Sequence, residues 1–339
     1  MTQREAQHEA WLPSRRQVLI AGGLVGAVAN VGAYLNAPKL KIAQRSGIAF
    51  GTTVSLKASH ADAIQLNNAL DAAWREIVRV EQAASLFRPE SALSTLNRMG
   101  ALVDPPETLV QLIAEALDIA RLTGGAFDPT VQPLWRVYAN AHAAGRTATD
   151  AEIASASALI GWHDIGVSSK RIQLARPGMA LTLNGVAQGF ATERCLAILK
   201  ENGIENAFLN TGEIGVAGKR DDRSLWTAAI ADPRHPGDYV AFAQPLSGIL
   251  ATSGDYATVW SSDFSHHHIL DPKTHRSPPL TASVSVLAQS GSMADGLATA
   301  LMAMGPEKSL ALARRLPGVA ALIVTKAGER FMTHGFPVT

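Results

Sequence analysis

Strand-like and helix-like segments alternate along residues 45–339 without the even spacing that repeated βαβ units require. Residues 47–58 are rich in Val, Thr and Ile, which favours a strand. Residues 61–83 place apolar side chains at helical intervals, which predicts a long amphipathic helix. The irregular order of the two patterns argues against a doubly wound fold and predicts an α/β or α+β fold with mixed sheets.

Proline and glycine residues mark the bounds of further predicted elements. Pro105 and Pro106 precede, and Gly124 and Gly125 follow, a predicted helix at residues 106–123. No Pro- or Gly-rich linker divides the chain cleanly, so residues 45–339 are expected to form one domain. Other helices are predicted at 150–160, 187–202 and 306–315, and strands at 164–167, 172–174, 207–210, 225–231, 239–242, 283–288 and 319–324.

The first 40 residues have a different character. Arg15 and Arg16 precede a mildly apolar stretch at residues 18–35 that is rich in Gly and Ala. This pattern is typical of a twin-arginine signal peptide, so residues 1–40 predict export to the periplasm. Because no clean Ala-x-Ala cleavage site is present, a retained membrane anchor is the alternative. Twin-arginine export often carries proteins that fold around a cofactor before transit.

Charge and cysteine content exclude several classes of protein. The 30 basic and 29 acidic residues give a net charge of +1, which provides no general attraction for nucleic acid or anionic lipid. The one cysteine, Cys195, cannot form an intrachain disulfide. The chain also contains no Walker loop, Cys-x-x-Cys pair, His-Glu-x-x-His or Gly-x-Ser-x-Gly motif.

Two polar turns follow predicted helices. Residues 85–91 close the first long helix, and Ser91 is suited to cap a short second helix. Residues 124–135 begin with two glycines, which let a backbone approach a flat ligand on which Phe127 can pack. The alternative for the second turn is a helix end followed by an Asp-Pro turn.

Two further segments suit a phosphate and its cation. Residues 181–190 are expected to form a strand-to-helix turn, where free N–H groups favour an anion. Asp295 and Thr299 are four residues apart, so on a helix they share a face, and both offer the hard oxygen ligands that Mg²⁺ prefers. Taken alone, this pair is better explained by a solvated helix face.

Three consecutive histidines follow the segment 250–256. His266, His267 and His268 suggest zinc, but neighbouring side chains on an extended chain point in different directions and seldom bind one ion. Because of this histidine run, an exported metal- or solute-binding module is still kept as an alternative function.

Taken together and in this order, the five segments resemble the ApbE family of flavin transferases. The resemblance runs from Phe50 to about Gly305 and is most specific at residues 253–256, 268–274 and 294–299. It implies a fold of the T-fold type with a ligand cleft between two lobes. It also implies Mg²⁺-dependent transfer of FMN from FAD to a threonine or serine hydroxyl of an acceptor flavoprotein, with release of AMP.

The resemblance implies three groups of site residues. A metal would be held by Asp295, Thr299 and a backbone oxygen near Gly185. The proton of the acceptor hydroxyl would be handled by His268, with Asp271 or Asp255 as alternatives for orienting it. The residues expected to bind FAD are Phe50, Phe87, Ala126, Phe127, Asp128, Thr182, Gln188 and Ile269.

The sequence departs from the family pattern Asp-Leu-Gly-Gly-x-Ala-Lys-Gly in the phosphate turn. Thr182, Asn184 and Gln188 replace its Asp, one Gly and the Lys, and the next Gly-Gly-Asp appears as Gly212-Glu213-Ile214. This form resembles the NosX branch, which supplies FMN to the membrane flavoprotein NosR. Because a carboxylate and an ammonium are missing, a flavin-binding or flavin-delivery protein without transfer, or an FAD pyrophosphatase, are alternatives.

Overall fold

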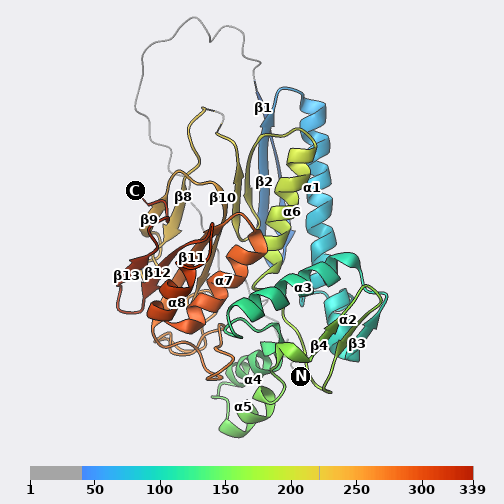
Figure 1. Cartoon of the computed structure of the whole chain (residues 1–339), viewed down its shortest axis with the longest axis vertical. Coiled ribbons are helices and arrows are strands. Elements are labelled where there is room, and N and C mark those ends of the chain that lie inside the picture. Colours follow the sequence, from blue (N-terminus) through green and yellow to red (C-terminus); the bar gives the residue numbers. More distant parts are fainter. Residues whose placement is uncertain (1–39, 221, 339) are drawn as a thin grey trace, which may run out of the picture.

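An eight-stranded antiparallel sheet runs through the part of the chain that the computed structural model describes, residues 40–220 and 222–338 (Figure 1). The strand order is β1-β2-β6-β7-β10-β11-β12-β13, and every neighbouring pair is antiparallel. The strands of this sheet are β1 Lys41–Ala49, β2 Thr52–His60, β6 Asn206–Asn210, β7 Ile214–Ala217, β10 Gly248–Gly254, β11 Thr281–Ala288, β12 Ala320–Thr325 and β13 Arg330–Met332.

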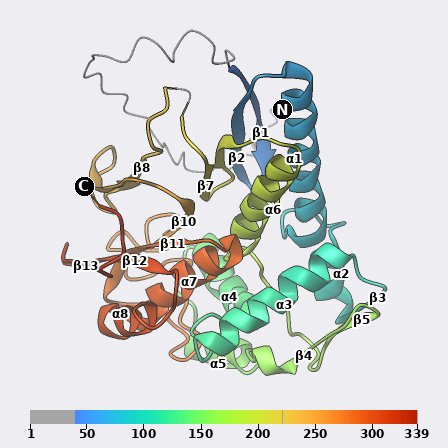
Figure 2. The same cartoon turned by 45° about the horizontal axis from the view of Figure 1, so that its top comes forward.

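Three helices cover one face of the sheet, and each packs on the next (Figure 2). They are α1 (Ala63–Ala84), α6 (Ala187–Glu201) and α7 (Gly291–Met304). In α1 the apolar residues recur at helical spacing and are buried, and the Asp62 side chain accepts hydrogen bonds from the first turn. Burial of this apolar stripe against the sheet and α6 therefore fixes α1 in place.

The other face of the sheet is covered by a hairpin of β8 (Ala228–Ala231) and β9 (Tyr239–Ala243). Neighbouring residues of β10 show the two faces, because side chains alternate along a strand. Ile249 and Ala251 pack with α7, whereas Leu250 packs with the β8–β9 hairpin. Both faces of the sheet are thus buried at β10.

Smaller elements surround α3 (Glu107–Leu122), which packs on both α1 and α7. A separate three-stranded sheet has the order β3-β5-β4, and an apolar cluster on α4 and α5 includes Tyr138, which stacks on Trp260 at a centroid distance of 5.5 Å. The remaining elements are α2 Ala92–Met99, β3 Ala101–Val103, α4 Gln132–Ala143, α5 Asp150–Ser157, β4 Ile165–Val167, β5 Arg171–Leu174 and α8 Pro306–Ala313, with short 3₁₀ turns at Pro129–Val131 and Trp162–Asp164.

The predicted α/β fold class is confirmed, and most predicted elements appear within a few residues of their expected bounds. The single strand expected at 47–58 is wrong. Phe50 and Gly51 adopt positive φ angles of 54° and 72°, so the segment turns and forms two paired strands, β1 and β2. The expected signal peptide falls almost wholly outside the described residues. Among the helices of the described part, none is long and apolar enough to cross a membrane.

Candidate functional site

The crossing of α6 and α7 brings the backbone of Gly189 against that of Gly291. A Cβ on either glycine would clash with the carbonyl oxygen of the other, so the crossing needs two glycines. The Gly189 N–H donates to Asp295 Oδ2 at 3.0 Å, and the Asp295 side chain is buried. The interpretation of Asp295 as part of a solvated helix face is therefore wrong, because α6 covers that face of α7.

Thr299, one turn further along α7, faces the segment before α6. A Cβ on Gly185 would lie 2.9 Å from Thr299 Oγ1 and 3.2 Å from the Phe127 ring. Ser253 Oγ, from β10, lies 3.2 Å from the same Thr299 oxygen. Residues from four distant parts of the chain thus meet around one hydroxyl.

These groups fit a small hard cation in their chemistry. Thr299, Asp295 and the backbone at Gly185 offer oxygen ligands of the kind that Mg²⁺ prefers. In residues 40–220 and 222–338 no three or more His, Cys, Asp or Glu side chains gather closely enough to hold a metal by themselves. A cation at Asp295 and Thr299 would therefore need additional oxygens, such as those of a phosphate or water.

The segment 181–188 reaches this site as an irregular turn and not as the end of a strand, which corrects that expectation. The Thr182 N–H donates to Pro129 O at 2.8 Å, and the Thr182 hydroxyl accepts from the Asn184 N–H. Gln188 lies in the first turn of α6, and its amide packs against Gly212, whose φ is 104°. Tertiary contacts therefore hold this turn between residues 129 and 212.

The turn after α3 is also closely held. Asp128 accepts hydrogen bonds from Thr130 Oγ1 at 2.6 Å and from the Trp162 N–H at 3.2 Å, and its burial raises the pKa of the carboxyl group. Ala126 and Phe127 are buried in the main core. The backbone hydrogen bond from Thr182 to Pro129 brings the segment that contains Phe127 next to the turn at Thr182.

The histidine loop runs past α7. Ile269 belongs to the apolar cluster of that helix, and His268 Nδ1 lies 3.3 Å from Thr258 O. Asp271 shapes the next turn, because it accepts from the Lys273 N–H at 2.9 Å and its own backbone pairs with Arg276. Within this loop, His268 is half-buried and the neighbouring His267 is fully buried.

Asp255, unlike the predicted site residues Asp128 and Asp271, lies in an ion pair with an arginine. It is completely buried, and Arg234 donates to both of its oxygens at 2.8 and 2.7 Å. Lys326 Nζ lies 3.7 Å from the same carboxylate. These contacts anchor the loop that starts after β10, and they show Asp255 in an ion pair.

Phe50 and Phe87 lie near the C-terminal end of α1. The Phe50 N–H donates to Glu81 Oε1 at 3.0 Å, and Gly51 packs against the Phe87 ring. Phe87 is 65% exposed. Phe50 packs against the main core, to which Phe127 also belongs.

The contact of Ser253 with Thr299 was missed by sequence reasoning, although Ser253 lies in a segment that the resemblance marks. Its contact with Thr299 comes from the pairing of β10 with its neighbours, which no local pattern encodes. Glu213 was missed in the same way. It is buried and accepts from the Thr252 N–H at 3.0 Å.

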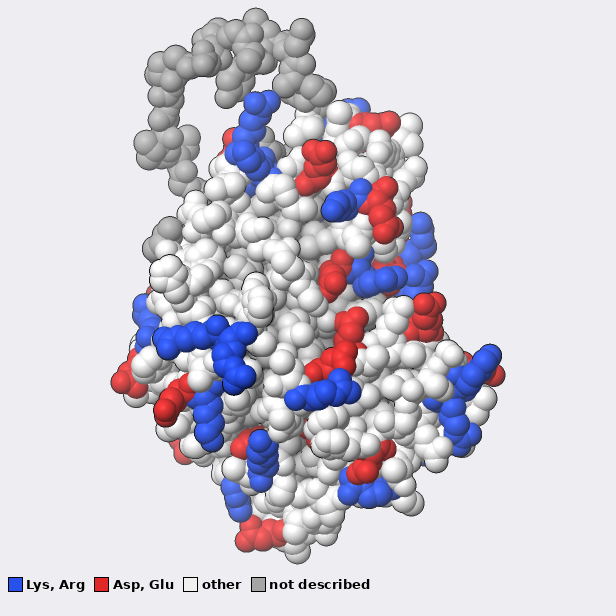
Figure 3. All heavy atoms as spheres, in the orientation of Figure 1, with Lys and Arg blue, Asp and Glu red and all other residues white. Residues whose placement is uncertain are grey.

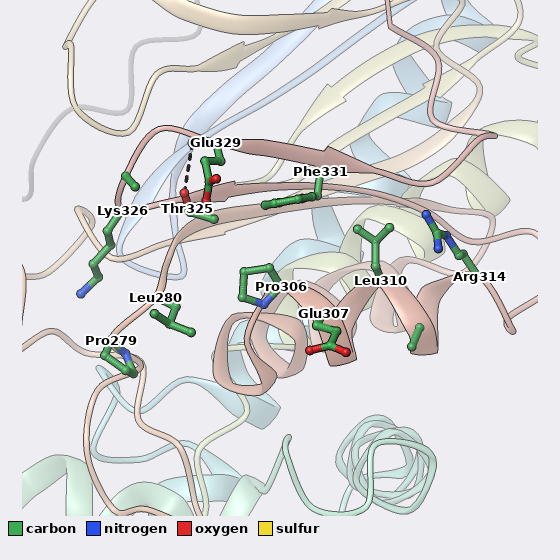
Figure 4. Close-up of a pocket in the computed structure, with 12 residues that line it drawn as sticks. Pro279, Leu280, Pro306, Glu307, Leu310, Arg314, Thr325, Lys326, Glu329 and Phe331 are labelled. Atoms are coloured by element: carbon green, nitrogen blue, oxygen red, sulfur yellow. Dashed lines mark hydrogen bonds between the residues drawn. The ribbon is translucent and has the colours of Figure 1, made fainter.

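A cavity of about 760 Å³ lies between α8 and the last two strands (Figure 4), and Lys326, which contacts Asp255, is part of its lining. Leu280, Leu310 and Phe331 line it together with charged residues such as Lys326. None of the predicted site residues lines this cavity.

On the face drawn in Figure 3, basic and acidic side chains are interspersed, which agrees with the low net charge.

A family model and curated relatives all point to the same protein family. The model of the ApbE family matches residues 50–323. An FAD:protein FMN transferase of Vibrio cholerae is 30% identical over 313 residues, which cover 85% of this chain and 89% of the relative. One of Treponema pallidum is 30% identical over 325 residues, which cover 89% and 90%.

Solved structures agree. The flavin transferase ApbE of Vibrio cholerae superposes with a TM-score of 0.74 at 27% identity and covers 88% of this chain and 98% of its own. The ApbE protein of Thermotoga maritima has a TM-score of 0.78 at 27% identity, with coverage of 87% and 97%.

Proposed function

Because the chain belongs to the ApbE family and is an enzyme, we propose that it transfers FMN from FAD to a threonine or serine hydroxyl of an acceptor flavoprotein. The observation that carries the proposal is the meeting of Gly185, Asp295 and Thr299 where α7 crosses the start of α6. A pyrophosphate there would face these oxygen ligands beside the start of α6, whose helix dipole favours an anion.

The proposed reaction balances as a phosphoryl-type transfer. The acceptor hydroxyl oxygen forms a bond to the phosphorus of the FMN half, the pyrophosphate bridge breaks, and AMP leaves with the bridging oxygen. The hydroxyl proton passes to a base. Mg²⁺, held by Asp295, Thr299 and the backbone at Gly185, would supply neutralisation of the phosphate charge.

Residues of the chain would orient the two substrates. Phe127 and Ile269 offer apolar contact to a flavin or adenine ring, and the turn from Thr182 to Gln188 faces the phosphates. His268 is the proposed base, since a histidine can take up a proton near neutral pH. Asp271 shapes the turn that follows His268, and the ion pair of Asp255 anchors the strand end before the loop.

The test is incubation of the purified protein with FAD, Mg²⁺ and a threonine-bearing acceptor domain, followed by mass measurement of the acceptor and quantification of AMP. A covalently flavinylated acceptor with one AMP per label supports transfer. FMN and AMP without a labelled acceptor would indicate an FAD pyrophosphatase, and bound flavin without products a delivery protein. No flavin affinity would favour the metal- or solute-binding module.

The location and the acceptor belong to the same proposal. Arg15 and Arg16 before an apolar stretch support twin-arginine export to the periplasm, where a NosR-type flavoprotein is the proposed acceptor. Changing both arginines to lysine should leave the protein in the cytoplasm, as measured by fractionation and immunoblotting. Unchanged periplasmic recovery would contradict the export route.

A further inference from the structure

Glu213 lies where two strands of the main sheet separate next to the site. β7 and β10 pair from Gly248 with Val216 to Leu250 with Ile214, and their ladder ends there. β10 continues beside β11 to Gly254. Beyond Leu250 the N–H groups of β10 on the β7 side therefore need another acceptor, because a buried backbone donor without one is costly.

The Glu213 side chain supplies this acceptor. Its Oε2 accepts from the Thr252 N–H at 3.0 Å, and the residue is only 5% exposed. On its other side, the turn at Gly212 packs against the Gln188 amide. Thr211 Oγ1 donates to Gln188 O at 3.2 Å. The turn 211–213 thus connects the start of α6 to the strand that carries Ser253.

The next residue after Thr252 reaches the proposed metal ligand. Ser253 Oγ lies 3.2 Å from Thr299 Oγ1. The Thr252 side chain lies on the opposite face of the strand and contacts Ser285 Oγ at 2.8 Å. A hydrogen bond to the Thr252 N–H therefore fixes the strand position from which Ser253 touches Thr299.

We propose that Glu213 is a positioning residue that holds Ser253 against Thr299 and so orients Thr299 toward a divalent cation. The inference rests on the proposed function for the identity of that cation. It assigns Glu213 no contact with the reacting atoms. An amide oxygen could accept the same bond, so the role requires an acceptor and not a charge.

Glu213→Ala, Glu213→Gln, Ser253→Ala and Thr252→Ala would be compared with the wild-type protein. Mg²⁺ binding to the flavin-free protein would be measured by calorimetry, and the Mg²⁺ dependence of acceptor labelling would give KM and kcat separately. We expect Glu213→Ala to weaken Mg²⁺ binding by about five- to tenfold, the effect of one lost hydrogen bond. Glu213→Gln should stay within about twofold of wild type.

Thr252→Ala is the matched control, because it removes the neighbouring side chain and keeps the N–H. It should leave Mg²⁺ affinity unchanged. Ser253→Ala should reproduce the loss of Mg²⁺ affinity seen in Glu213→Ala. The double variant Glu213→Ala with Ser253→Ala should lose no more affinity than either single variant. Ser253→Ala also keeps the test valid if Glu213→Ala does not fold.

Wild-type affinity in Glu213→Ala would overturn the inference, as would a loss in Glu213→Gln as large as in Glu213→Ala. Additive losses in the double variant would also contradict it. If the wild-type protein binds Mg²⁺ but labels no acceptor, the proposed function fails while the positioning role of Glu213 can still be read from binding. If the wild-type protein binds no Mg²⁺ in either assay, the metal site itself is wrong.

Discussion

At the scale of single residues, Asp295 accepts the Gly189 N–H through one oxygen, and the proposed metal site gives its carboxylate charge a second task. Asp295→Asn keeps an acceptor but loses the charge, whereas Asp295→Ala loses both. Both variants should lower Mg²⁺-dependent labelling by about 100-fold or more.

The two variants should differ in stability. Asp295→Ala should lose about 1 kcal/mol of unfolding free energy with the hydrogen bond, and Asp295→Asn should lose less. Urea denaturation would measure this difference. Full activity of either variant across a Mg²⁺ titration would remove Asp295 from the proposed metal site.

At the scale of elements, the crossing of α6 and α7 depends on Gly189 and Gly291. Each faces the carbonyl oxygen of the other, so an added methyl group would push the helices apart. Gly189→Ala should destabilise the fold by about 1–3 kcal/mol and displace Asp295 from its bond to α6. Thermal and urea unfolding, together with Mg²⁺ affinity, would measure both effects.

The matched control for this crossing is Gly335→Ala. A Cβ on Gly335 would meet no atom within 4 Å, so this change should be close to neutral. If Gly189→Ala were as stable as Gly335→Ala, the close approach of the two helices would not be a constraint on the fold.

At the scale of the whole molecule, burial of His267 links folding to pH. Its side chain is fully buried, and burial with the nearby charges of Lys326 and Arg234 lowers its pKa to about 4, from an ordinary value of 6.5. The folded protein therefore holds this ring neutral, while the unfolded chain takes up a proton below pH 6.5. Stability from this residue is present above pH 6.5 and is lost as the pH falls toward 4.

The size of this loss follows from the difference between the two pKa values and is about 3 kcal/mol. The free energy of unfolding, measured in urea from pH 7 to pH 4, should fall by this amount on account of His267. His267→Gln should show a flatter profile over the same range, whatever its absolute stability. An identical slope in both proteins would contradict the assignment.

Local patterns were sufficient for much of this molecule. The apolar spacing of α1 predicted its length closely, and Ser91 caps α2 as expected, because its hydroxyl accepts from the Ser94 N–H. Such features depend on neighbours within one or two helical turns. The motifs at Asp295 and Thr299 also identified the family, since the resemblance rests on residue types and order alone.

Tertiary structure decided where those residues lie and what they contact. Asp255 and Asp295 are both acidic and both buried, yet Arg234 pairs with the first and the backbone of Gly189 bonds to the second. The contact between Glu213 and Thr252, on which the proposed role of Glu213 rests, depends on a sheet order in which β10 lies between β7 and β11. Contacts between residues so far apart in the chain depend on which strands pair and which helices cross, and no local pattern of the sequence specifies these arrangements.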